Sequence, residues 1–156
     1  MAYWLLKTEP ESFGIGQLAA LPRRTTSWDG VRNYQARNFL RDDVRRGDLA
    51  FLYHSSCAVP GIAGTVKVVR AAYADASAFD PRDAHHDPAS DPTAPRWFTI
   101  DVQLQRRLPR LITLDELRAH AHDKLRGLTL LQRGNRLSVM PVASAHWRFL
   151  LSLACV

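Results

Sequence analysis

The sequence has 156 residues, 46% of them hydrophobic, and a formal net charge of +6 at pH 7. This length and hydrophobic content support a single domain over residues 1–156 with its own core, and the charge favours a polyanionic partner. The two cysteines, Cys57 and Cys155, lie far apart without a CxxC motif, which excludes a disulfide framework and a zinc site of that kind. Because no apolar run reaches membrane-spanning length and residues 1–9 contain no basic leader, we expect a cytoplasmic protein without a membrane partner.

Short strands and short helices alternate in the expected secondary structure. Periodicity and turn residues predict strands at residues 3–8, 49–54, 62–73, 97–104 and 136–142, and helices at residues 15–21, 35–42, 113–121 and 144–153. Thr113 is a suitable N-cap, with Glu116 at the third helical position. Residues 75–95 are rich in Asp, Ala and Pro and predict a loop. Together these features predict an α+β fold with a small, partly open β-barrel and peripheral helices.

Charge is distributed unevenly along the chain. Residues 23–46 contain seven Arg and three Asp, whereas residues 75–93 contain five Asp and one Arg. GC-rich codon usage would also raise the overall arginine content. The clustering favours one basic face, on which planar guanidinium groups can bind phosphate or base edges.

Residues 28–38 combine aromatic, amide and guanidinium side chains in a segment that begins as a loop. This mixture suits a flat polar ligand such as a nucleobase, which needs an apolar face and hydrogen-bonding partners at its edge. Trp28 is either the stacking surface or a core anchor beneath the loop. Asn33 and Asn38 either read a base edge or have structural roles as a helix cap and a buried hydrogen bond.

Other candidate binding residues lie at the ends of predicted strands and in the basic segment. The apolar strand at residues 49–54 runs directly into polar residues, which indicates a site at its tip. Each candidate also has a structural explanation, such as an ion pair with Glu9, a strand cap, a core position or a solvated surface charge. The candidates are Lys7, Tyr34, Arg37, His54, Ser55, Ser56, Arg96, Trp97 and Ser138.

Seven ordered motifs give the chain a resemblance to a known family. They lie at residues 4–10 (WLLKTEP), 28–38 (WDGVRNYQARN), 53–55, 79–81, 87–88, 95–97 and 130–139 (LLQRGNRLSV). Together they resemble the EVE-domain family over nearly the whole chain. The resemblance implies a PUA-like fold, with a small, partly open mixed β-barrel, and a pocket for a modified nucleobase. The sequence departs from the family pattern at His85 and His86, where we would expect two tyrosines, and at Ser56 and Cys57, where a Ser-Asn pair is common.

Three functions are consistent with these residues. The leading hypothesis is a non-catalytic module that binds DNA or RNA and recognises a modified base in a pocket walled by Trp28 and Trp97. The PUA-like superfamily that the resemblance implies also includes ASCH-type hydrolases, which implies an alternative, a small hydrolase of nucleosides or RNA. Lys7, Thr8 and Glu9 supply the residue types that such enzymes use, although consecutive positions of a strand cannot all face one pocket. A protein-interaction domain is the third. No catalytic residue, metal site or cofactor is predicted, because His54 and Cys57 form a poorly placed pair at a strand end.

Overall fold

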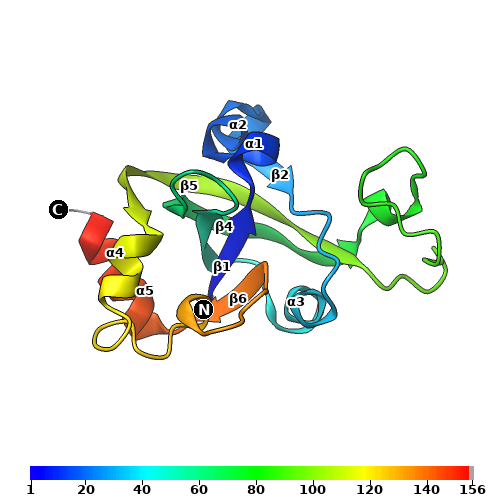
Figure 1. Ribbon diagram of the computed structural model, residues 1–156. Coiled ribbons are helices and arrows are strands. Elements are labelled where there is room, and N and C mark those ends of the chain that lie inside the picture. The colour runs from blue at the N-terminus through cyan, green and yellow to red at the C-terminus, as the bar shows by residue number, and fades with distance from the viewer. Residues whose placement is uncertain (155–156) are drawn as a thin grey trace.

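A six-stranded mixed sheet forms the centre of residues 1–154, the part of the chain that the computed structural model describes (Figure 1). The strand order is β2-β5-β4-β3-β1-β6, and β1 and β3 form the one parallel pair within these residues. Because β2 and β6 are edges, the sheet is not closed into a barrel. The expected α+β class is confirmed. The strands are β1 (Tyr3–Thr8), β2 (Thr25–Ser27), β3 (Leu49–His54), β4 (Gly61–Ala74), β5 (Phe98–Thr113) and β6 (Val139–Val142).

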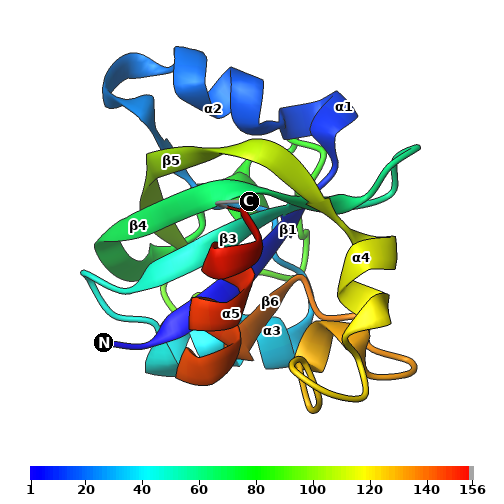
Figure 2. The ribbon, with the colours of Figure 1, turned by 90° about the vertical axis from the view of Figure 1, so that its left-hand side faces the viewer.

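Helices surround this sheet on several sides. In Figure 1, α1 and α2 lie above the sheet, α3 lies below it, and α4 and α5 cover its left-hand side, which faces the viewer in Figure 2. No helix in residues 1–154 has both the length and the apolar character needed to cross a membrane. The helices are α1 (Pro10–Phe13), α2 (Ile15–Ala20), α3 (Tyr34–Asn38), α4 (Leu114–Ala119) and α5 (Ser144–Ala154), with helical turns η1 (Pro22–Arg24), η2 (Phe39–Asp43), η3 (Ala76–Phe79) and η4 (Thr129–Leu131).

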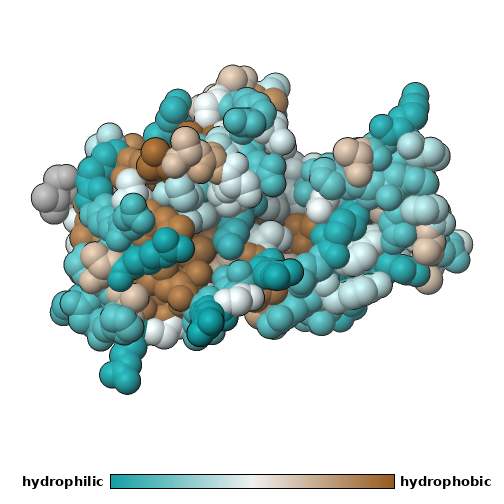
Figure 3. Space-filling view, viewed as in Figure 1, coloured by the Kyte–Doolittle hydropathy of each residue, from teal (hydrophilic) through white to brown (hydrophobic). Residues whose placement is uncertain are grey.

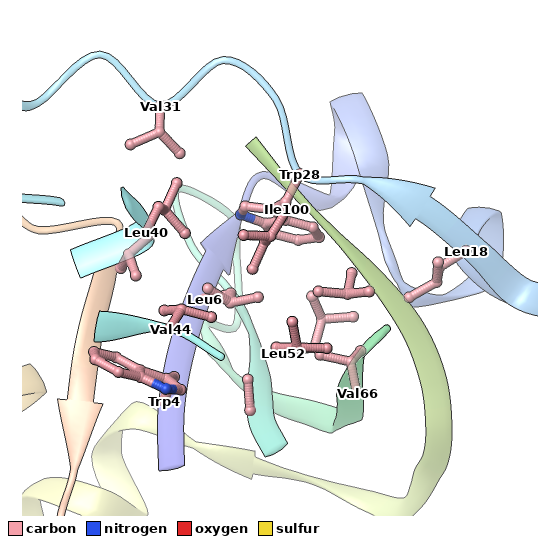
Figure 4. Packing of buried hydrophobic residues seen from close by; sticks show 14 of the residues in the cluster. Trp4, Leu6, Leu18, Trp28, Val31, Leu40, Val44, Leu52, Val66 and Ile100 are labelled. Atoms are coloured by element: carbon pink, nitrogen blue, oxygen red, sulfur yellow. The ribbon is translucent and has the colours of Figure 1, made fainter. Parts of the chain in front are cut away.

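Alternating side chains of β1 divide the buried residues between the two faces of the sheet. Trp4 and Leu6 belong to one apolar cluster, which also contains Leu18 of α2 and Trp28 (Figure 4). Leu5 belongs to the other, which packs against α4 and α5. Each fully buried side chain of this size contributes about 1.5–3 kcal/mol of transfer free energy. Both faces of β1 are therefore needed to hold the strand in place.

Parallel pairing of β1 and β3 brings the carboxyl ends of the two strands to the same edge of the sheet, with Thr8 opposite His54. The chain leaves β1 at Pro10, which opens α1. The Nε2 atom of His54 accepts the backbone N–H of Ile15 at 3.2 Å and so satisfies a free donor at the start of α2. The first two helices are thereby fixed over the end of β1.

Several element boundaries differ from the sequence-based expectation. α1 and β2 were not expected, because segments of three or four residues give no periodic signal. The strand expected at residues 97–104 continues to Thr113 as β5. Its pairing with β4 shifts register at several points, and these irregularities interrupt the alternation of side chains on which the prediction depends.

One helix begins at its predicted cap, and another predicted helix is divided in two. Thr113 caps α4 as expected, because its hydroxyl accepts the Glu116 N–H at 3.2 Å. The helix expected at residues 35–42 divides into α3 and η2. At the end of η2 the Val44 N–H donates to the Phe39 carbonyl, five residues back, and this wider turn has no signal in a 3.6-residue pattern.

Candidate functional site

A cleft of about 450 Å³ opens where β1 ends. Its walls are formed by residues 7–9 and 12–13 at the junction of β1 with α1, by residues 26–31 at the end of β2 and just after it, and by His85 and Ser138. The Lys7 N–H donates to the Ser138 carbonyl at 2.9 Å, which ties the chain before β6 to the end of β1. Five separate parts of the sequence therefore meet around one hollow.

Trp28 forms an apolar wall of the cleft and is also part of the core. The residue is 7% exposed and belongs to the cluster shown in Figure 4. Its indole packs edge-on against Phe13, with ring centroids 6.3 Å apart and an interplanar angle of 80°. Its backbone N–H donates to the Ile100 carbonyl at 2.7 Å. The two roles considered from the sequence, stacking surface and core anchor, are compatible in this position.

Residues 75–95 form a lobe that stands out from the sheet at the right of Figure 1 and carries mostly hydrophilic residues in Figure 3. Asp75, 1% exposed, anchors the base of this lobe. Its carboxylate accepts the Gly30 N–H at 2.9 Å, the Arg32 guanidinium at 3.0 Å and the Ser77 hydroxyl at 2.6 Å. The guanidinium of Arg32 also donates to the His85 carbonyl at 2.7 Å. The lobe is thus docked onto the segment that contains Trp28.

Hydrogen bonding decides the charge of this anchor. Burial alone would raise the pKa of Asp75. The hydrogen bonds from Ser77, Gly30 and Arg32 stabilise the carboxylate more strongly and hold its pKa below the usual value. Asp75 is therefore an ionised structural residue, and its role is to hold His85 at the rim of the cleft.

Two ionisable groups inside the cleft have shifted pKa values. Burial lowers the pKa of the Lys7 ammonium. Asp29 lies at the mouth of the cleft and is exposed as a whole, but the surrounding protein removes water from one side of its carboxylate. This partial burial, and then the negative charge of Asp75, raise the pKa of Asp29. A cation, a carboxyl group and an indole wall in one hollow can hold a flat heterocycle with polar edges.

Of the twelve binding residues expected from the sequence, the structure brings Lys7, Trp28 and Ser138 together in this cleft. Asn33 caps α3 instead, since its side-chain oxygen accepts the Ala36 N–H at 3.0 Å. Asn38 accepts from the Arg37 guanidinium at 2.9 Å.

The remaining aromatic and basic candidates form a separate cluster beside the lobe. Tyr34 stacks on Trp97 with centroids 4.8 Å apart, and the Arg37 guanidinium lies 4.9 Å from the Tyr34 ring centroid. Trp97 is 6% exposed and donates to Asp87 at 2.7 Å. Arg96 donates to a backbone carbonyl of the lobe, that of residue 89, at 3.2 Å. These four residues do not line the cleft.

The polar residues at the end of β3 and just after it also lie outside the lining of the cleft. His54 supports α2, and burial and then the charge of Arg107 lower its pKa. Ser55 donates to the Thr8 carbonyl through its N–H at 2.9 Å and its hydroxyl at 3.4 Å. Ser56 adopts a positive φ of 53° in the following turn. Together these residues stiffen the end of the β1–β3 pair.

Ten of the thirteen lining residues were not among the predicted site residues, Asp29, Gly30 and His85 among them, and neither was the anchor Asp75. The acidic content of residues 75–93, opposite in sign to residues 23–46, was the signal that could have paired the two segments. Within residues 1–154, no group of three or more His, Cys, Asp or Glu side chains could hold a metal ion.

The fold is an α+β domain with an open sheet, and a cleft with an aromatic wall lies beyond the end of its parallel strand pair. These features define a small binding module. The EVE domain model matches residues 2–153, and the chain belongs to the EVE-domain family. The expected resemblance is confirmed. Thymocyte nuclear protein 1 of Danio rerio is 46% identical over 96% of this chain and 71% of its own length. The human protein of the same name is 44% identical, over 97% and 73%.

Solved structures give the same result. The crystal structure of human THYN1 in complex with 5-methylcytosine-containing DNA matches with a TM-score of 0.94 and 43% identity, over 99% of this chain and 98% of that one. A protein from Pseudomonas putida matches with a TM-score of 0.92 and 45% identity, over 98% and 99% of the two chains.

Proposed function

We propose that this protein is a non-catalytic DNA-binding module that takes a modified nucleobase, 5-methylcytosine, into the cleft beside Trp28. The observation that carries the proposal is the position of the Trp28 indole, an apolar wall next to the polar groups of Lys7 and Asp29. The close likeness to human THYN1, whose structure was solved with 5-methylcytosine-containing DNA, supports the choice of ligand.

In the proposed complex each part of the cleft meets a different part of the base. The face of the base stacks on Trp28, an interaction worth about 1–3 kcal/mol. The Asp29 carboxylate accepts the exocyclic amino group, which cytosine has and thymine lacks. Lys7 donates to a carbonyl or phosphate oxygen. Since a paired base cannot reach such a cleft, the nucleotide enters flipped out of a duplex or from a single strand.

Binding of matched oligonucleotides tests this proposal. Burial of one methyl group is worth about 0.8 kcal/mol, so we expect about fourfold tighter binding of 5-methylcytosine than of cytosine in the same sequence. The Asp29→Asn variant should lose the preference for 5-methylcytosine over thymine. Equal affinity of the wild type for cytosine and 5-methylcytosine, in DNA and in an RNA of the same sequence, would contradict the assignment.

Trp28 needs a variant that separates stacking from folding. Trp28→Ala removes the wall and also about 3–5 kcal/mol of core packing, so its folding must be checked by thermal unfolding. Trp28→Phe keeps an aromatic ring in the core but offers a smaller stacking surface. We expect Trp28→Phe to remain folded and to bind the methylated oligonucleotide less tightly than the wild type; unchanged affinity would argue against the wall.

The other two candidate functions have less support. Lys7, Thr8 and Glu9 all line the cleft, contrary to the expectation that consecutive positions could not share one pocket, because β1 ends at Thr8 and Glu9 lies beyond it. In a hydrolase that uses these residues, however, the Thr8 hydroxyl would have to face the substrate, but it donates to the Phe13 carbonyl at 2.6 Å. A protein-interaction domain whose basic face is merely solvated predicts no salt-dependent DNA binding, so the same titrations test it.

We also propose that the chain acts as one domain in a reducing, cytoplasmic compartment. The domain assignment is supported by the single sheet and by the family match over residues 2–153. The compartment is supported by the sparse cysteine content of the sequence. Limited proteolysis that released a folded fragment would contradict the first, and a fluorescent fusion that is exported would contradict the second.

A further inference from the structure

The cleft beside Trp28 is called the base cleft below. Two more hollows adjoin it around the turn at residues 132–138. One, of about 360 Å³, lies between residues 33–35 and this turn. The other, of about 330 Å³, lies on the other side of the turn and reaches Lys7. Residues 132–135 line both, and Lys7 lines the second as well as the base cleft. The 132–138 turn therefore stands between three neighbouring hollows.

The two additional hollows are lined by basic and neutral residues alone. Their charged lining residues are Lys7, Arg118, Arg133 and Arg136, and neither hollow is lined by a carboxylate. A concave surface with one sign of charge concentrates the electrostatic potential and attracts ions of the opposite sign. These hollows consequently favour an anionic ligand that passes close to the base cleft.

Arg133 and Arg136 are exposed, and within residues 1–154 neither has a hydrogen bond or an ion pair. Other arginines near the cleft are engaged in the fold: Arg32 is paired with Asp75, and Arg37 donates to the carbonyl of Arg96 at 2.6 Å. Unlike Arg32 and Arg37 in the segment that follows Trp28, Arg133 and Arg136 thus keep their guanidinium groups available for an external partner.

The backbone that carries these two arginines is well fixed. Gly134 supplies a φ of +76°, which suits a tight turn. The Asn135 N–H donates to the Gln132 carbonyl at 3.2 Å, and its side chain accepts the Leu137 N–H at 3.1 Å. The Lys7 N–H bonds the end of the turn to β1. A preformed turn loses little conformational freedom when a ligand binds.

We propose that the 132–138 turn is a phosphate-binding platform, on which Arg133 and Arg136 hold the DNA backbone beside the nucleotide that enters the base cleft. This inference rests on the proposed function and assigns a different task to a different surface. Phosphate contacts supply affinity and orientation and carry no information about the base. Trp28 and Asp29 determine which base is bound, whereas the turn determines how strongly any DNA is held.

The double variant Arg133→Ala/Arg136→Ala tests the platform. Its affinity should be measured for methylated and unmethylated DNA of one sequence between about 50 and 200 mM salt. The plot of log K against log salt has a negative slope, and each lost phosphate contact reduces the magnitude of that slope by about 0.9. We expect this magnitude to fall by about 1 to 2, and both affinities to fall by the same factor of at least about tenfold. An unchanged slope and affinity, or a change in methyl preference alone, would overturn the proposal.

A matched control removes the same charge elsewhere. Arg46 and Arg148 are also exposed and, within residues 1–154, their side chains lack an ion pair or hydrogen bond. Arg46 precedes β3 and thus lies at the other end of the sheet, and Arg148 lies on α5. The Arg46→Ala/Arg148→Ala variant should bind like the wild type; an equal loss would show that net charge alone matters and would overturn the platform.

Failure of the platform and failure of the proposed function give different results. If the wild type does not distinguish methylated from unmethylated DNA but the Arg133→Ala/Arg136→Ala variant still loses salt-dependent binding, the platform is supported and the base assignment is wrong. Arg133→Lys/Arg136→Lys keeps both charges and should retain most of the salt slope. A slope as low as that of the alanine variant would contradict a role based on charge.

Discussion

The imidazole of His85 lies directly against Gly30. A Cβ atom built on Gly30 would stand 2.7 Å from the Cε1 and Nε2 atoms of this ring, and Gly30 has a φ of +79°. Glycine suits this position for two reasons: the turn has a left-handed conformation, and a side chain here would force the half-exposed His85 ring to move aside. One glycine fixes both the direction of the chain after Trp28 and the closure of the cleft rim.

Gly30→Ala should therefore lower both stability and DNA binding. The left-handed conformation costs about 1–2 kcal/mol for a residue with a Cβ atom, and the contact with His85 displaces the rim in addition. Thermal unfolding and titration with methylated DNA would measure the two losses.

Gly127→Ala is the matched control for this variant. Gly127 has a similar φ of +84°, but nothing lies within 4 Å of the Cβ position. We expect Gly127→Ala to lose about as much stability as Gly30→Ala but to bind DNA with the affinity of the wild type. If the two variants bind DNA equally well, the His85 contact has no part in the site.

Asp75→Asn should destabilise the protein by about 2–4 kcal/mol at neutral pH, because it removes the charged acceptor of a buried ion pair. The folded pKa of Asp75 is lowered, so its contribution to stability is present above the unfolded pKa of about 3.9 and is lost as the pH falls toward the folded value. Urea unfolding of both proteins should show a difference that is constant near neutral pH and narrows below about pH 4. A difference that persists unchanged at pH 2.5 would contradict this role.

Tyr73→Phe should remove one tyrosine's contribution to the ultraviolet titration near pH 12. Burial, and then the hydrogen bond that its hydroxyl donates to Asp101 at 2.5 Å, raise the Tyr73 pKa to about 12. Because the folded pKa is raised, the protonated Tyr73 hydroxyl contributes to the stability of the fold. This contribution is fully present below the unfolded pKa of about 10 and is lost as the pH rises through the folded pKa. Tyr34→Phe, which changes an exposed ring, should leave that transition in place. A Tyr73→Phe titration identical to that of the wild type near pH 12 would contradict the hydrogen bond.

Lys7→Met should weaken binding of methylated and unmethylated DNA alike, by about tenfold, because one cation is lost from the boundary of two hollows. Burial lowers the Lys7 pKa, so in the wild type this cation is lost as the pH rises through the lowered value. The affinity of the wild type should thus fall with rising pH more steeply than that of Lys7→Met. Parallel pH profiles for the two proteins would show that Lys7 does not contact DNA.

Sequence patterns predicted the fold where elements were long or had a specific cap. The strands at residues 3–8 and 49–54 have the predicted bounds, since each is an uninterrupted apolar run that ends at polar residues. The N-cap Thr113 was identified from its spacing to Glu116. The strand order could not be predicted, because the parallel pairing of β1 with β3 depends on a crossover of about forty residues, and β-pairing carries no local sequence signal.

The candidate site was predicted in part. Trp28 was predicted because it lies two residues before a glycine and close to a basic stretch, and it does line the cleft. Trp97 and Tyr34 were grouped with it on chemical type, but whether two aromatic rings face one hollow or stack on each other is decided by tertiary structure. Asp75 was not predicted and His85 was noted only as a departure from the family pattern, because an acidic loop is usually solvated and two of the donors that bind Asp75, Gly30 and Arg32, lie more than forty positions earlier in the sequence.

The cleft that we propose as the base-binding site takes residues from near the start, from the middle and from near the end of the chain: Lys7, Trp28, His85 and Ser138. No fragment much shorter than the whole domain can contain all of them. Recombination that transfers this recognition ability from one protein to another must accordingly move the entire unit, and a truncation anywhere between residues 7 and 138 abolishes the site rather than trimming it.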